Sequence, residues 1–210
     1  GSGGGCHRHP GRGRCSWCAP DHRVDPADRC RARPAPPPRP SWPLRVAGVA
    51  GVDFLDQRDG TIEPTLALRR EIVRCIRRHK PSIIVCPSPE YRWDPFYIGR
   101  HHPDHLAVGQ AVIAAIYPSA RNAWDFPELL EEGLLPHRVK ELWVVGAPNT
   151  NHFVNVSETV DVKIEALRAH DSQLGAHFDE VAKNVRSGLQ LNGSKYGVSA
   201  AEEFYRAGVG

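Results

Sequence analysis

The sequence contains no methionine among its 210 residues, position 1 included. It also lacks any apolar run close to the roughly 18 residues that span a bilayer, and its first residues show no apolar signal region. The missing methionine favours a fragment or a processed product. The missing apolar segments predict a cytoplasmic protein without membrane contact, and a hydrophobic fraction of 40% suits one globular domain.

Residues 1–42 lack Lys, Glu, Leu, Ile, Phe and Tyr, and Val24 is their one branched aliphatic residue. Such a segment cannot bury enough apolar surface to offset the conformational entropy that it would lose on folding. We therefore expect residues 1–43 to form an atypical, disordered Arg/Pro/Gly-rich segment. Residues 44–210 are expected to form the folded domain.

Charge and cysteine spacing argue against nucleic-acid binding. Eight arginines against three aspartates give residues 1–42 a formal charge of +5, which leaves −2 for the rest. A main domain that is not basic gives no electrostatic support for binding a polyanion. Cys15 and Cys18 form one Cys-x-x-Cys pair, but a zinc knuckle needs a second pair of matching spacing. A knuckle within residues 6–30 is therefore a distant alternative.

The remaining chain alternates strand and helix patterns. Residues 81–86 (Pro-Ser-Ile-Ile-Val-Cys) predict a strand buried on both faces, as in a parallel sheet. Further strands are predicted at 52–55, 141–145 and 153–156, and helices at 68–76, 105–116, about 159–170 and about 179–189. In the first helix, Arg69, Arg70, Arg74, Arg77 and Arg78 are expected on the solvated face. The pattern predicts an α/β, Rossmann-like sheet flanked by helices.

His102 and His105 stand three residues apart where a long loop meets a predicted helix, so their side chains share one side. Sheets of this class place their sites in loops that follow the carboxyl ends of strands. The loop before His102 is rich in aromatic and charged residues, which suit a sugar-like ligand. Its candidate pocket residues are Tyr91, Arg92, Trp93, Asp94, Tyr97 and Arg100.

The run His102-Pro103-Asp104-His105, followed by Ala107-Val108-Gly109 and a helix, resembles the H-P-D-H motif of the PIG-L (LmbE-like) family of zinc-dependent de-N-acetylases. The segments 52–60 and 163–173 also match, so the resemblance covers about residues 44–210. It implies hydrolysis of an N-acetyl group on an amino-sugar-type conjugate, with zinc as cofactor.

The resemblance also implies roles for single residues. His105 would bind zinc, and His102 would polarise the amide carbonyl and stabilise the oxyanion. Asp104 would assist His102, although it could equally cap the helix. Asp59 would be a carboxylate on the substrate side, although it could equally be a plain turn residue before Gly60.

The family's first motif, A-H-P-D-D, supplies two zinc ligands and the general base. The nearest match here, His9-Pro10-Gly11-Arg12, lacks both carboxylates. We therefore expect an N-terminally incomplete fold, an incomplete zinc site and a chain whose activity is uncertain. The alternative is a non-catalytic remnant or a small-molecule binding protein without metal. The residues predict neither an exact substrate nor an oligomeric state.

Overall fold

A computed structural model describes residues 46–93 and 96–210. The proposed N-terminal segment and Asp94 lie outside the described residues. Within the described part, no helix is long and apolar enough to cross a membrane. The elements in chain order are α2 (Leu66–His79), β1 (Ile83–Pro87), η2 (Ile98–Arg100), α3 (Pro103–Ile116), η3 (Ser119–Arg121), α4 (Glu128–Glu131), β2 (Glu141–Val145), β3 (His152–Asn155), α5 (Val160–Arg168), α6 (Asp171–Leu174), η4 (Gly175–His177), α7 (Phe178–Ser194) and β4 (Ala201–Gly208).

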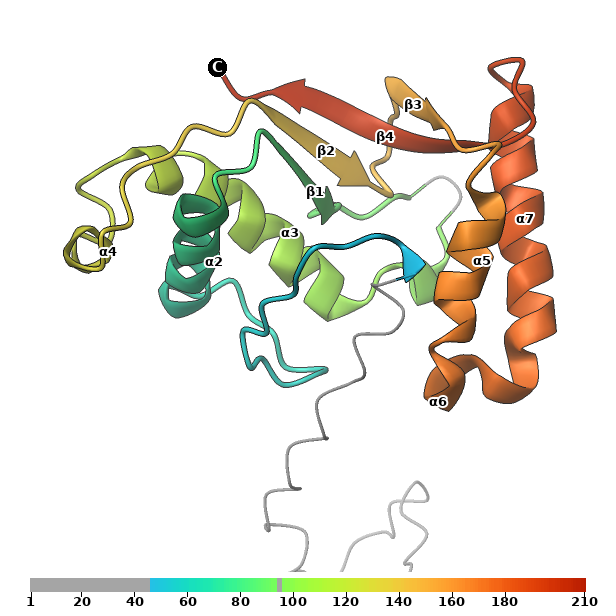
Figure 1. The fold of residues 1–210 in the computed structure, drawn as a ribbon, viewed down its shortest axis with the longest axis horizontal. Coiled ribbons are helices and arrows are strands. Elements are labelled where there is room, and N and C mark those ends of the chain that lie inside the picture. Colours follow the sequence, from blue (N-terminus) through green and yellow to red (C-terminus); the bar gives the residue numbers. More distant parts are fainter. Residues whose placement is uncertain (1–45, 94–95) are drawn as a thin grey trace, which may run out of the picture. The chain divides into compact units, whose positions relative to one another are not determined.

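The described strands form one mixed sheet in the order β1-β2-β4-β3. β1 and β2 are parallel, with Ile83 opposite Glu141. β4 runs antiparallel to both of its neighbours, β2 and β3. In Figure 1, α2 and α3 lie on one side of β1 and β2, while α5 and α7 lie side by side at the β3 end. This arrangement confirms the predicted α/β sheet flanked by helices.

The main core fills the space between α2, α3 and the facing side of β1 and β2. Apolar residues at helical spacing in α2 and α3 meet alternate residues of the two strands, as a half-buried sheet requires. Its buried members are Val73, Ile76, Cys86, Val112, Ala115, Ile116, Ala120, Leu129, Val139, Leu142, Val144 and Ala147.

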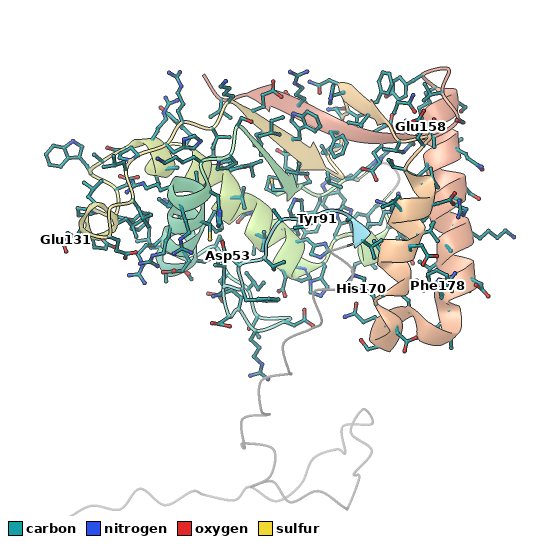
Figure 2. All side chains as sticks on the ribbon, in the orientation of Figure 1. Asp53, Tyr91, Glu131, Glu158, His170 and Phe178 are labelled. Atoms are coloured by element: carbon teal, nitrogen blue, oxygen red, sulfur yellow. The ribbon has the colours of Figure 1, made fainter. Side chains whose placement is uncertain are left out.

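A second, smaller core joins α5 to α7. Ile164, Phe178 and Ala182 are its buried members. The guanidinium carbon of Arg168 lies 4.1 Å from the centroid of the Phe178 ring, and Figure 2 labels Phe178 beside these helices. The predicted helices near 159–170 and 179–189 are thus confirmed, with shifted ends.

Arg77 corrects the prediction that the arginines of α2 all face solvent. Its side chain is fully buried. The guanidinium donates hydrogen bonds to four backbone carbonyls, those of Ser119, Ala120, Asn122 and Asp125, at 2.8–3.2 Å. The prediction was wrong because helical spacing cannot reveal that a distant turn aims its carbonyl groups at one position.

Two strand predictions also need correction, and one strand was missed. Residues 52–55 form no strand, because no partner strand lies beside them in the described residues. β1 is where it was predicted but is not buried on both faces: Ile83 and Val85 are 43% and 54% exposed, since α3 covers the opposite face. β4 was not predicted, because Glu202, Glu203 and Arg206 interrupt its apolar pattern.

Candidate active site

His102 is the N-cap of α3, and Pro103 takes the first helical position, where its fixed φ suits the helix and its missing N–H costs nothing. Nδ1 of the His102 ring accepts the backbone N–H of Asp104 at 3.2 Å. Because Nδ1 is an acceptor, the neutral ring carries its proton on Nε2. The side chain is exposed, so this N–H is available to a ligand.

Asp104 lies in the first turn of α3 and is 5% exposed. Its Oδ2 accepts the backbone N–H of Gly60 at 2.6 Å, and its Oδ1 accepts that of Ile62 at 3.2 Å. His102, rather than Asp104, therefore caps the helix. The Asp104 carboxylate instead ties the helix to a loop that precedes it by more than 40 residues.

Asp59, His102 and Asp104 each offer a ligand atom within 4.8 Å of the others. Two carboxylates and one imidazole are donors that zinc accepts. Carboxylates that bind metals are commonly hydrogen-bonded by groups behind them, as Asp104 is by Gly60 and Ile62. The donor types of this group therefore fit a zinc ion.

His105 lies beside this group, with its ring centroid 5.5 Å from that of His102 and the two planes inclined by 42°. It borders a cleft of about 210 Å³ at the carboxyl ends of β1 and β2. The cleft thus occupies the position predicted from the fold class. The role of His105 as a zinc ligand stays a prediction.

The residues around the cleft come mainly from the two strand ends and the loop between β1 and α3. They are Pro87, Ser88, Glu90, Arg92, Arg100, His101, His105, Leu106, Val145 and Gly146. Arg92 and Arg100, both predicted pocket residues, are among them. Trp93 and Tyr97 are not, and their side chains are 72% and 63% exposed. Whether any of the four binds substrate stays a prediction.

Four rings from the loop form what we call the aromatic cluster: Tyr91, Trp93, Phe96 and His101. Phe96 stacks between Trp93, at 4.9 Å between centroids, and His101, at 5.4 Å. Tyr91, labelled in Figure 2, lies 5.2 Å from His101 and 5.7 Å from Trp93. The cluster therefore reaches the cleft through His101, and its other rings are exposed.

Sequence reasoning missed Glu90 and His101 as cleft residues. Glu90 and His101 stand at the two ends of the predicted loop, and His101 directly precedes the motif histidine. This position in the loop was the feature of the sequence that could have indicated them as cleft residues. Without a structure, an extra histidine next to His102 has no distinguishable role. Its Nε2 is bonded to the backbone oxygen of Arg92 at 3.2 Å, which fixes the ring in the aromatic cluster.

Glu203 on β4 links this loop to the sheet electrostatically. Burial raises the pKa of its carboxyl, but hydrogen bonds from Lys195 and Tyr196, at 2.8 and 2.7 Å, together with the charge of Arg92, lower the pKa more. The net pKa is below the usual range. The charge of Arg92 on the loop is thus one of the influences that keep Glu203 on the sheet ionised.

Residues 42–116, which include Asp59 and both motif histidines, match the family model described as PIG-L: GlcNAc-PI de-N-acetylase. A diacetylchitobiose deacetylase of Thermococcus kodakarensis is 32% identical over 128 residues, 61% of this chain and 45% of that protein. A probable N-acetyl-alpha-D-glucosaminyl L-malate deacetylase 2 of Bacillus anthracis is 28% identical over 146 residues, 69% and 58% of the two chains. The chain thus spans about half the length of the curated relatives it matches.

Solved structures give the same fold. The N,N'-diacetylchitobiose deacetylase of Pyrococcus horikoshii, complexed with an inhibitor, aligns with a TM-score of 0.68 at 21% identity, over 80% of this chain and 61% of that one. A 4-carboxy-2-hydroxymuconate hydratase of Pseudomonas putida aligns with a TM-score of 0.62 at 13% identity, over 80% and 68%. Because a hydratase also shares it, the fold alone does not give a reaction. The match over residues 42–116, together with the relatives, confirms the resemblance to the PIG-L family over this part of the chain.

Proposed function

We propose that this chain is a zinc-dependent hydrolase that removes an N-acetyl group from an amino-sugar conjugate. The observation that carries the proposal is the pairing of His102 and His105 at the start of α3, beside Asp59 and the cleft. The names of the two curated relatives, a diacetylchitobiose deacetylase and an N-acetylglucosaminyl malate deacetylase, support this reaction class.

His102 would act on the amide carbonyl of the substrate. Its Nδ1 already accepts the Asp104 amide, so the neutral ring presents Nε2–H as a donor. A donor at this position stabilises the negative charge that forms on the carbonyl oxygen, and removing such a donor typically costs about 10²–10³ in kcat. The N-cap geometry therefore supports the role that the family resemblance implies.

Zinc would be held by His105 with the Asp59 carboxylate of the neighbouring group. When bound, it lowers the pKa of a water ligand and polarises a carbonyl. A second assignment makes His102 the imidazole ligand, with Asp59 and Asp104, because each of these three residues offers a ligand atom within 4.8 Å of the others. Because Nδ1 already accepts the Asp104 amide, Nε2 would be the nitrogen that binds. One ring nitrogen cannot both bind zinc and donate a proton, so the two assignments exclude each other.

The substrate would enter the cleft between the two strand ends. Arg92 and Arg100 can donate hydrogen bonds to sugar hydroxyl or carboxylate oxygens. The aromatic cluster offers flat apolar faces at the exposed side, which suits the C–H faces of a sugar ring. We propose residues 44–210 as the functional domain.

The test measures zinc per chain, after purification without chelators, for the wild type, His105→Ala, His102→Ala and His177→Ala. His177 is exposed and does not border the cleft, so its replacement controls for the loss of an imidazole. We expect zinc to be lost in His105→Ala and retained in the other two. Loss in His102→Ala instead would assign that ring as the ligand.

The same variants are then assayed for acetate release from N,N'-diacetylchitobiose and from an N-acetylglucosaminyl malate. We expect His102→Ala to keep its zinc and lose activity by about 10²-fold or more. Wild-type protein that binds no zinc and releases no acetate would favour the non-catalytic alternative.

A further inference from the structure

Asp104 is the most deeply buried charged residue of the site, and its carboxylate has defined partners. Both oxygens accept backbone N–H groups of one loop, from Gly60 and Ile62. Hydrogen bonds to an ionised acceptor are about twice as strong as neutral ones. These two contacts fasten residues 60–62 to the first turn of α3.

Asp59 directly precedes this fastened segment. Its carboxylate is exposed, yet it lies within 4.8 Å of ligand atoms of His102 and Asp104. Gly60 has φ +81, a backbone conformation that other L-residues rarely adopt, so the chain turns sharply at this point. The position of Asp59 therefore depends on where the Gly60 amide is held.

The contact between Asp104 and His102 is of a different kind. The His102 ring is bonded to the backbone N–H of Asp104, not to its carboxylate. The hydrogen bonds that engage the Asp104 carboxylate are therefore those from the loop amides.

We infer that Asp104 is a positioning residue that holds the loop at residues 59–62 against α3, so that Asp59 stays beside His102. It acts on the substrate through Asp59 and not through the protonation of His102. The assignment of a ligand to Asp59 rests on the proposed function, whereas the contact between Asp104 and the loop does not.

Amide hydrogen exchange tests the contact without any assay of activity. In the wild type, the Gly60 and Ile62 amides should exchange slowly, because both are bonded to a buried acceptor. Asp104→Asn replaces one acceptor oxygen by an N–H donor, so it should speed exchange at one or both by about tenfold or more. Asp56→Asn is the matched control: Asp56 is exposed in the same segment, and Asn tolerates its φ of +51.

A double-mutant cycle tests whether Asp104 affects substrate binding through Asp59. With Asp59→Ala, Asp104→Asn and the double variant, we expect Asp104→Asn to raise KM about three- to tenfold and to leave the pH profile of kcat unchanged. The double variant should then equal Asp59→Ala, because the two residues act through one contact. A shifted pH profile, or effects that multiply, would overturn the inference.

Rapid exchange of Gly60 and Ile62 in the wild type would also overturn it, and this result does not require Asp104→Asn to fold. Protected amides in a wild-type chain without deacetylase activity would contradict the proposed function while leaving the positioning contact established.

Discussion

A Cβ atom built on Gly109 of α3 would lie 2.5 Å from the carbonyl oxygen of Pro87 at the end of β1. It would also lie 2.9 Å from the backbone nitrogen of Pro89. Backbone atoms at such distances cannot move aside as a flexible side chain would. The absence of a side chain at Gly109 therefore sets how closely α3 approaches the strand end, and with it the distance of the histidines from the cleft.

Gly109→Ala should lower the free energy of unfolding by about 1–3 kcal/mol, because the added methyl overpacks a backbone contact. Gly188→Ala is the matched control, since Gly188 lies in α7 with no atom within 4 Å of its built Cβ. That change should raise stability by roughly 0.5–1 kcal/mol through helix propensity. Urea denaturation of both variants checks the pair, and equal shifts in the same direction would refute the close approach.

Arg77→Lys should destabilise the protein by about 2–4 kcal/mol, because a lysine ammonium cannot replace the guanidinium hydrogen bonds to four carbonyls. Arg78→Lys changes the adjacent arginine, whose side chain is 48% exposed, and should shift stability by less than about 0.5 kcal/mol. Thermal and urea unfolding measure both. Similar values for the two variants would show that the buried contacts of Arg77 contribute little.

Glu203→Gln should cost roughly 1–3 kcal/mol at pH 7, because Lys195 and Tyr196 donate to its ionised carboxylate. The folded-state pKa of Glu203 is lowered, so this stabilisation is present above the unfolded pKa of about 4.3 and is lost as pH falls below it. Urea unfolding from pH 7 to pH 3 should show the wild type and the variant converging. Glu202→Gln, at the neighbouring exposed pair with Lys163, should cost about 0–1 kcal/mol at pH 7. A difference for Glu203→Gln that widens toward low pH would contradict this assignment.

Trp93→Ala should raise KM for an N-acetylated disaccharide about three- to tenfold with little change in kcat, because an exposed stacking face contributes about 0.5–1.5 kcal/mol. Its stability should change little, since the ring is 72% exposed. Trp124→Ala removes an even more exposed indole, at 88%, from outside the cleft, and should leave KM unchanged. Equal KM values for both variants would show that Trp93 does not contact the substrate.

The sequence predicted the parts of the fold that depend on local periodicity. Val112 and Ile116 in α3, and Ile164 in α5, are buried where helical spacing put them. β4 was missed because its two glutamates and one arginine are partly exposed or hydrogen-bonded. Its sequence therefore lacks the regular alternation of apolar and polar residues that distinguishes a strand from a loop. The burial of Arg77 was missed because it depends on carbonyl groups more than 40 residues away.

The sequence could predict the site residues that belong to one short motif. His102, Asp104 and His105 lie within four residues of chain, so the helix start alone brings them together. The position of Asp59 beside them required a contact that spans 44 residues, between Gly60 and Asp104. Spacing along the chain contains no information about such a contact, and the family resemblance was what pointed to Asp59.

The burial pattern of the main core also bears on the order in which the molecule is made. The buried members of this core in the described residues lie between Val73 and Ala147, and the site residues, with those that line the cleft, lie between Asp59 and Gly146. Because domains are synthesised from the N-terminus and begin folding during synthesis, this core and its site can assemble before β4 leaves the ribosome. β4, which follows the other described strands in the chain, then inserts between β2 and β3, two strands already translated. A nascent chain whose first 150 residues have emerged from the ribosome would therefore carry the helical layer with its histidines, while β3 and β4 had still to join the sheet.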